Sequence, residues 1–165
     1  MQPRIQNPAL SVPGVATALQ RLSKASKQSG VPETTTMLVT LRASQINGCA
    51  VCVDMHTREL KLAGEPDQRI HTVAAFRESS YFNDAERAAL ALTEAATRLA
   101  DRPDSVSDEI WEEAARHYDE PELAALVVTI ASINAWNRLN ATTRQITGEW
   151  VAQYIEPAQP VSRAA

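Results

Sequence analysis

The chain has 165 residues, a formal net charge of −4, 44% hydrophobic residues and only 2 cysteines. Its length suits one domain with a buried core that needs no disulfide for stability. The charge leaves no basic stripe for phosphates, no apolar run reaches the roughly 20 residues of a membrane span, and the first residues lack the apolar stretch of a signal peptide. We therefore expect a cytoplasmic protein that binds neither nucleic acid nor membrane.

Helical periodicity runs through most of the chain, with Pro and Gly at the boundaries. Apart from a short β-branched run at 34–36, no segment has a strand pattern, so we expect an all-α fold. A single domain should cover residues 14–155, after an extended N-terminal arm at 1–13 and before a flexible tail at 156–165. In chain order, the predicted helices cover residues 14–28, 32–46, 49–64, 67–76, 85–100, 107–117 and 122–139.

The last predicted helix is apolar around most of its surface from Leu123 to Trp136. A helix that is apolar on all sides must be buried on all sides. A chain this short can bury such a helix only in the centre of a bundle or against another subunit. We therefore expect a homo-oligomer. We also expect Trp111 to face inward, and Trp136 and Trp150 to anchor the core or an interface.

Cys49, Cys52 and His56 are the most informative residues of the sequence. Each helical residue advances by about 100°, so the two thiols and the imidazole share one narrow face. A thiolate is the reactive form of cysteine, and a helix start stabilises it at Cys49. The spacing of the cysteines permits a disulfide, and His56 can exchange protons near neutral pH. The pattern predicts a cycle of thiolate, sulfenic acid, disulfide and re-reduction.

Two other interpretations of this pattern stay open. Cysteine and histidine ligands at this spacing also suit zinc, with His71, His117 or a carboxylate as the fourth ligand. Alternatively, the cysteines are inert core residues and His56 is a surface histidine.

The segment Leu41 to His56, LRASQINGCAVCVDMH, resembles the core motif of the AhpD-like alkylhydroperoxidases of the carboxymuconolactone decarboxylase superfamily. The resemblance covers about residues 30–140. It implies an AhpD-like helical bundle that assembles into trimers or hexamers, with the site near a subunit interface. It also implies reduction of hydroperoxides without haem, flavin or metal, and regeneration by a thiol or dithiol reductant protein. Further segments that resemble one branch of these proteins are 77–79, 86–90 and 133–138.

The resemblance also implies roles for the three residues of the motif. Cys52 would be the peroxidatic thiol, Cys49 the resolving thiol and His56 part of a proton relay. The helix dipole alone would instead favour Cys49 as the more acidic thiol. A thiol–disulfide reductase or redox sensor, and a non-catalytic oligomer that keeps the motif as structure, remain alternatives to the peroxidase.

The sequence departs from the family pattern at Met37, where members with the full relay carry a glutamate. A methionine cannot shuttle protons, so another acid must take this place or the activity is weak. Glu78 is our first candidate, followed by Glu86 and Glu94, although a structural salt bridge explains each of them as well. For Asn134, Asn137 and Arg138 we expect buried hydrogen bonds or a subunit contact.

Overall fold

The computed structural model describes residues 2–28, 30–101, 103–148 and 151. All regular elements of these residues are helical, which confirms the all-α fold. They are α1 (Pro8–Ser11), α2 (Val15–Ser26), α3 (Glu33–Ile46), α4 (Ala50–Leu62), α5 (Asp67–Thr72), the 3₁₀ helix η1 (Val73–Ala75), α6 (Asp84–Thr97), α7 (Asp108–Ala115) and α8 (Glu120–Thr143).

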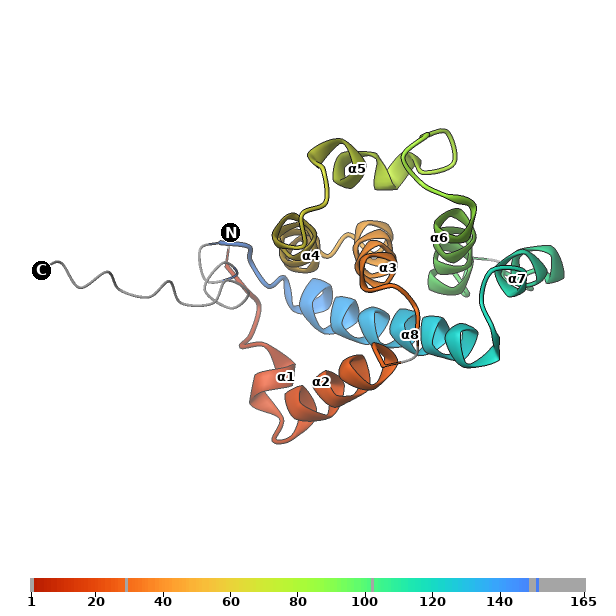
Figure 1. The fold of residues 1–165 in the computed structure, drawn as a ribbon. Coiled ribbons are helices and arrows are strands. Elements are labelled where there is room, and N and C mark those ends of the chain that lie inside the picture. Colours follow the sequence, from red (N-terminus) through yellow and green to blue (C-terminus); the bar gives the residue numbers. More distant parts are fainter. Residues whose placement is uncertain (1, 29, 102, 149–150, 152–165) are drawn as a thin grey trace, which may run out of the picture.

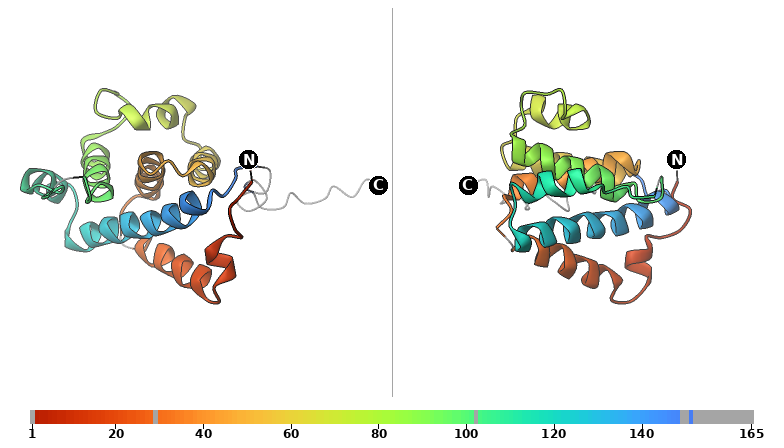
Figure 2. Two further views of the ribbon diagram at one scale, coloured as in Figure 1. Left: turned by 180° about the vertical axis from the view of Figure 1, so that it is seen from behind. Right: turned by 90° about the vertical axis from the view of Figure 1, so that its right-hand side faces the viewer.

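The helices α3 and α8 form the centre of the bundle. α3 contacts α4, α6 and α8, while α2 packs against α8 on its far side (Figures 1 and 2). Leu38, Val39 and Leu41 of α3 are at most 1% exposed. A small part of the core lies where α3, α4 and α8 meet, and it contains both cysteines. Its members are Ala43, Cys49, Val51, Cys52 and Ile133, with Trp136 packed against them.

Capping explains where α8 begins. The Asp119 side chain accepts the amide of Glu122, and the Glu122 carboxylate accepts the amide of Asp119. This capping box starts the helix at Glu120, before the predicted start, and the helix continues to Thr143, beyond the predicted end at 139. The additional C-terminal turn brings Asn140 to the cysteines. No helix among the described residues, α8 included, is long and apolar enough to cross a membrane.

The expected extended arm is partly helical. Residues 8–11 form α1, with Pro8 at the first helical position and the Asn7 side chain accepting the amide of Ala9. Arg4 N–H donates to the carbonyl of Thr143 at 2.9 Å, so this segment is attached to the end of α8. The expected tail at 156–165 lies outside the described residues.

Two further expectations need correction. The predicted helix 67–76 divides into α5 and η1. Trp111 does not face inward, because it is 42% exposed while Ile110 and Ala114 of α7 pack toward the core. These two residues are one turn apart and share the inner face of the helix. Trp136 packs against the cysteine cluster as an anchor, and Trp150 lies outside the described residues.

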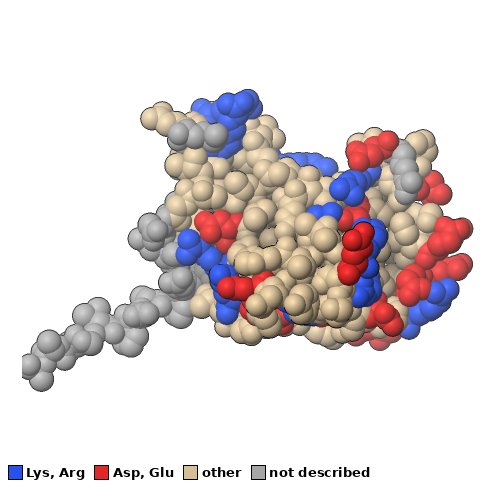
Figure 3. All heavy atoms as spheres, turned by 90° about the horizontal axis from the view of Figure 1, so that it is seen from above, with Lys and Arg blue, Asp and Glu red and all other residues tan. Residues whose placement is uncertain are grey.

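Acidic side chains gather at one end of the molecule, over α7 (Figure 3). Asp108 and Glu109 lie in the first turn of this helix, and Glu112 and Glu113 follow. Carboxylates in the first turn stabilise a helix because its amide dipoles place partial positive charge there. This acidic end is separate from the cysteines, which lie at the start of α4.

Candidate functional site

The two cysteines lie where α3 ends and α4 begins. Gly48 follows the C-cap of α3 with φ of +65°, a left-handed conformation that glycine adopts without strain. The amide of Gly48 donates to the carbonyl of Gln45, and the amide of Cys49 donates to that of Ser44 at 3.0 Å. This Schellman motif makes Cys49 the N-cap of α4. One sharp turn therefore places a cysteine at the positive end of a helix.

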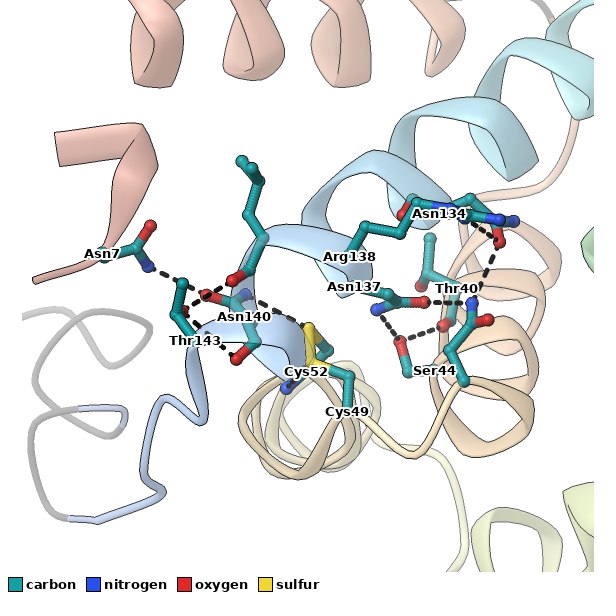
Figure 4. The surroundings of a disulfide bond; sticks show 12 residues. Asn7, Thr40, Ser44, Cys49, Cys52, Asn134, Asn137, Arg138, Asn140 and Thr143 are labelled. Atoms are coloured by element: carbon teal, nitrogen blue, oxygen red, sulfur yellow. Dashed lines mark hydrogen bonds between the residues drawn. A yellow bond between two sulfur atoms is a disulfide. The ribbon is translucent and has the colours of Figure 1, made fainter. Parts of the chain in front are cut away.

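Cys49 and Cys52 form a disulfide, with their Cα atoms 5.3 Å apart. Both residues are buried, at 2% and 3% exposure. The amide of Cys52 donates to Cys49 Sγ at 3.4 Å. Asn140 of α8 donates through Nδ2 to Cys52 Sγ, also at 3.4 Å (Figure 4). Among the described residues, Cys49 Sγ thus accepts from a backbone amide at the start of α4, and Cys52 Sγ accepts from a side-chain amide of α8.

A network of buried amides joins α3 to α8 beside the disulfide (Figure 4). Asn47 Nδ2 donates to the side-chain oxygens of Asn134 and Asn137, each at 2.9 Å. Asn137 Nδ2 donates to the Ser44 hydroxyl, and Arg138 donates to the side chain of Asn134. The buried hydrogen bonds expected for Asn134 and Asn137 are therefore present within one chain, whereas Arg138 is exposed. They fix the turn that carries Cys49.

His56 lies one turn after Cys52 on α4, and its partner is Glu59. The distance from Nδ1 to Glu59 Oε2 is 2.7 Å. Burial raises the pKa of Glu59, but the hydrogen bond and charge of His56 and the charge of Lys27 outweigh burial and hold this pKa below its usual range. No hydrogen bond among the described residues joins His56 to either sulfur. The sequence thus placed His56 on the correct helix, but the pattern did not identify Glu59.

The three carboxylates proposed to replace the missing glutamate have other surroundings. Glu78 is exposed, and the segment between η1 and α6 that carries it lies on the side of α3 and α4 that faces away from α8 (Figures 1 and 2). No hydrogen bond among the described residues joins Glu78 to the cysteines or to His56. Glu86 forms an ion pair with Arg69, and Glu94 forms ion pairs with Arg42 and Arg77.

The position of Met37 is apolar in the structure, because its side chain packs against the core formed by α3, α4, α5, η1 and α6. A carboxylate on α3 is thus absent from this position. The acid nearest to His56 comes instead from the same helix, three residues further on. The spacing of His56 and Glu59 was the available signal, since residues three apart are neighbours on a helix surface.

Asn140 was also missed, although its spacing gave a signal. Buried polar residues recur every three positions near the end of α8: Asn134, Asn137, Asn140 and Thr143. Residues three apart are neighbours on a helix surface, so each of these polar side chains lies beside the next.

The zinc interpretation finds no support in the arrangement of side chains. Among the described residues, no three His, Cys, Asp or Glu side chains come together in a way that would hold a metal ion. His71 is exposed, and His117 pairs with Glu113 on α7.

Sequence comparisons place the chain among known proteins. A model of the carboxymuconolactone decarboxylase family matches residues 13–95. The chain is 40% identical to the uncharacterized protein YdfG of Bacillus subtilis, over 72% of this chain and 80% of that protein. It is 30% identical to the uncharacterized protein YnjA of Escherichia coli, over 70% of this chain and 62% of that protein.

Solved structures show the same fold. A protein of unknown function from Agrobacterium tumefaciens, suggested to be the antioxidant defence protein AhpD, is 34% identical, with a TM-score of 0.82 over 89% of this chain and 99% of that one. The debrominase Bmp8 is 23% identical, with a TM-score of 0.74 over 87% of this chain and 76% of that one, which is a likeness of fold alone. The family match, the YdfG relative and the AhpD-like structure agree, and the chain therefore belongs to the carboxymuconolactone decarboxylase family, with an AhpD-like fold.

Proposed function

We propose that the protein reduces hydroperoxides through Cys49 and Cys52, without a metal or organic cofactor. One observation carries the proposal: the two cysteines, the only ones in the chain, are joined as a disulfide at the start of α4. The family membership supports the same chemistry. We also propose a cytoplasmic location, because the reducing conditions there would regenerate the pair.

In the proposed cycle, the Cys52 thiolate attacks one oxygen of the hydroperoxide. The O–O bond breaks, the alkoxide leaves with a proton as an alcohol, and Cys52 becomes a sulfenic acid. The Cys49 thiol then attacks this sulfur, forming the disulfide and releasing water. An external thiol or dithiol protein supplies the two electrons and two protons that restore both thiols.

His56 serves as the proton relay of this proposal. Glu59 holds its Nδ1 and takes the place of the glutamate that family members with the full relay carry at the position of Met37. Nε2 makes no hydrogen bond with any described residue, so this nitrogen can exchange a proton with water or with the leaving alkoxide. Glu78 has no part in this proposal, because no hydrogen bond among the described residues joins its side chain to the cysteines or to His56.

The test is consumption of cumene hydroperoxide by the reduced protein in the presence of dithiothreitol. We expect turnover in the wild type and its loss in both Cys49→Ser and Cys52→Ser. Serine is a good N-cap, so Cys49→Ser should keep the start of α4. This variant should accumulate a sulfenic acid on Cys52 that dimedone traps, whereas Cys52→Ser should yield no adduct.

The second candidate is a thiol–disulfide reductase or redox sensor, and the disulfide itself supports it, because either role needs only a cysteine pair that forms and breaks this bond. A disulfide that forms with diamide and is reduced by dithiothreitol, without consumption of peroxide, would support this candidate and contradict the peroxidase. A pair that stays reduced under both oxidants would contradict both.

A further inference from the structure

A line of three hydrogen bonds connects the N-terminal segment to the sulfur of Cys52, and Figure 4 shows the two that Asn140 makes. The amide of Ala9 donates to Asn7 Oδ1 at 3.0 Å. Asn7 Nδ2 donates to Asn140 Oδ1 at 2.8 Å, and Asn140 Nδ2 donates to Cys52 Sγ at 3.4 Å. Two side-chain amides from opposite ends of the chain thus lie in series between a helix cap and a redox-active sulfur.

The direction of this line is fixed at its outer end. A backbone N–H can only donate, so the Asn7 oxygen must face Ala9 and its NH₂ group must face Asn140. The Asn140 oxygen is then occupied by a donor, and only its NH₂ group is left for the sulfur. Without Asn7, either end of the Asn140 amide could face Cys52.

We propose that Asn140 is a catalytic residue that stabilises the Cys52 thiolate, and that Asn7 is a positioning residue that fixes the polarity of the Asn140 amide. This inference rests on the proposed function, since it identifies which thiol of the pair is the nucleophile. Asn140 is 7% exposed and Cys52 is 3% exposed, so water does not compete strongly for the hydrogen bond. An N–H donor favours an anion more strongly than a neutral acceptor.

Asn140 accounts for Cys52 as the nucleophile even though Cys49, and not Cys52, lies at the N-terminal end of α4. The amide of Cys52 points at the Cys49 sulfur and would stabilise a thiolate there. Asn140 supplies Cys52 with a donor of its own from a different helix. The side chain of Asn140 therefore makes Cys52, rather than Cys49, the nucleophile of the pair.

The segment that carries Asn7 is held against the end of α8. Arg4 donates from its amide to the carbonyl of Thr143 and from its guanidinium to the carbonyl of Thr142 at 3.0 Å. Gln145 Nε2 donates to the carbonyl of Ile5, also at 3.0 Å. Asn7 lies outside residues 13–95, which match the family model. The polarity of the site is thus set from a part of the chain beyond the matched region.

The experiment follows the ultraviolet absorbance of the thiolate against pH in variants with a single cysteine. The Cys49→Ser protein reports Cys52, the Cys52→Ser protein reports Cys49, and the double variant supplies the baseline. Adding Asn140→Ala should move the Cys52 midpoint upward by about one to two pH units, the effect of losing a hydrogen bond to a charged group. The Cys49 midpoint should stay in place.

Asn140→Asp is the sharper variant, because it keeps the shape of the side chain. Asn7 would hold one carboxylate oxygen, so the other would face the sulfur and repel the thiolate. The Cys52 midpoint should then rise further than in Asn140→Ala. This near-isosteric variant also provides the answer if the alanine protein does not fold.

Asn7→Ser tests the positioning role. Serine keeps a cap for α1 but cannot reach Asn140, so the Cys52 midpoint should rise, by less than in Asn140→Ala. Gln145→Ala is the matched control: it removes a contact that holds the same segment but no bond of the line, and it should leave the midpoint unchanged.

Equal effects of Asn140→Ala on both cysteines, or no effect on Cys52 from either Asn140 variant, would overturn the assignment of Asn140. A Gln145→Ala effect equal to that of Asn7→Ser would overturn the positioning role of Asn7. The titrations use no peroxide. A protein that fails the cumene hydroperoxide assay can therefore still confirm or refute this inference.

Discussion

The imidazole of His56 takes its orientation from one neighbour on its own helix. The Glu59 carboxylate can only accept, so it holds the proton of the neutral ring on Nδ1 and leaves Nε2 as the basic nitrogen. Because the pKa of Glu59 is lowered, this carboxylate stays ionised at neutral pH. The proton relay that we propose on two adjacent turns of α4 therefore needs no carboxylate from α3, which has Met37 at the corresponding position.

Glu59→Gln tests this pairing. A neutral amide accepts the Nδ1 proton of His56 less strongly than the ionised Glu59 carboxylate does, so we expect the rate of hydroperoxide reduction to fall about tenfold. The pH at which the rate is half-maximal should also shift, which a purely structural role would not cause. Steady-state rates measured across the pH range check both effects.

The matched control for this prediction is Asp54→Asn. Asp54 forms an ion pair with Arg58 on the same helix, with an N–O distance of 2.8 Å, but contacts neither His56 nor the cysteines through any described hydrogen bond. The rate of hydroperoxide reduction by the Asp54→Asn protein, and its dependence on pH, should match those of the wild type. An equal loss in both variants would attribute the effect to the stability of α4 and contradict the relay.

At the scale of elements, apolar periodicity predicted the helices that have one apolar face and a recognisable cap. It placed the turn at Gly48 and the start of α4 at Cys49 correctly, because glycine and the cap are local signals. It ended α8 too early, because the last turn is buried through polar residues such as Asn140 rather than apolar ones. The contacts of Glu94 depend on three segments meeting in space, which local spacing does not encode.

Glu94 joins α6 to α3 and to the segment after η1. It forms ion pairs with Arg42 and Arg77, and the side chains of Arg42 and Glu94 are 12% and 9% exposed. Burial raises the pKa of Glu94, but the hydrogen bonds and charges of Arg42 and Arg77 outweigh it and lower this pKa overall. At pH values above the ordinary pKa of glutamate, the ionised Glu94 therefore stabilises the fold. This stabilisation is lost as the pH falls through the lowered pKa of Glu94 in the folded protein.

Glu94→Gln should destabilise the protein by about 3 kcal/mol, because it leaves the guanidinium of Arg42 buried without its counter-ion. Urea unfolding at neutral pH measures this loss. The exposed pair of Glu113 and Arg116 supplies the control, and Glu113→Gln should cost less than about 1 kcal/mol. Similar costs for the two substitutions would contradict the structural role of Glu94.

At the scale of the whole molecule, one side of α8 is not covered by the described residues. Ala124, Val127 and Ala131 are exposed, with Val127 at 41%, although the helix is apolar around most of its surface. These positions recur at helical spacing and form one stripe. The expectation that α8 is buried on all sides therefore fails for the single chain, and a second copy of the chain is the partner we propose for this stripe.

Val127→Glu tests this assembly. A charge in an apolar interface costs several kcal/mol, so the variant should elute as a chain of about 18 kDa in light scattering, while the wild type should give a multiple of this mass. Leu62→Glu, at an exposed position on α4, is the control and should keep the wild-type mass. A monomeric wild type would contradict the proposal.

Tyr118 makes the stability of the whole chain sensitive to alkaline pH. Its side chain lies between α6 and the start of α8, where its hydroxyl donates to the carbonyl of Ala85 at 2.9 Å. Burial and the charges of Glu86 and Glu122 raise its pKa from 10.0 to about 12, against a smaller opposing hydrogen bond with Thr35. The unfolded chain loses this proton at lower pH than the folded chain. The contribution of Tyr118 is therefore complete below pH 10 and is lost as the pH rises through about 12.

Unfolding by urea at a series of alkaline pH values should reveal this dependence. Between pH 10 and about 12 the free energy of unfolding should fall by about 2 kcal/mol more in the wild type than in Tyr118→Phe, which has no proton to lose at this position. Lysine and arginine titrate over the same range in both proteins, so the difference isolates Tyr118. Tyr81→Phe, at a position that is 51% exposed, should retain the wild-type dependence. Parallel curves for the wild type and Tyr118→Phe would show that this tyrosine does not couple folding to its ionisation.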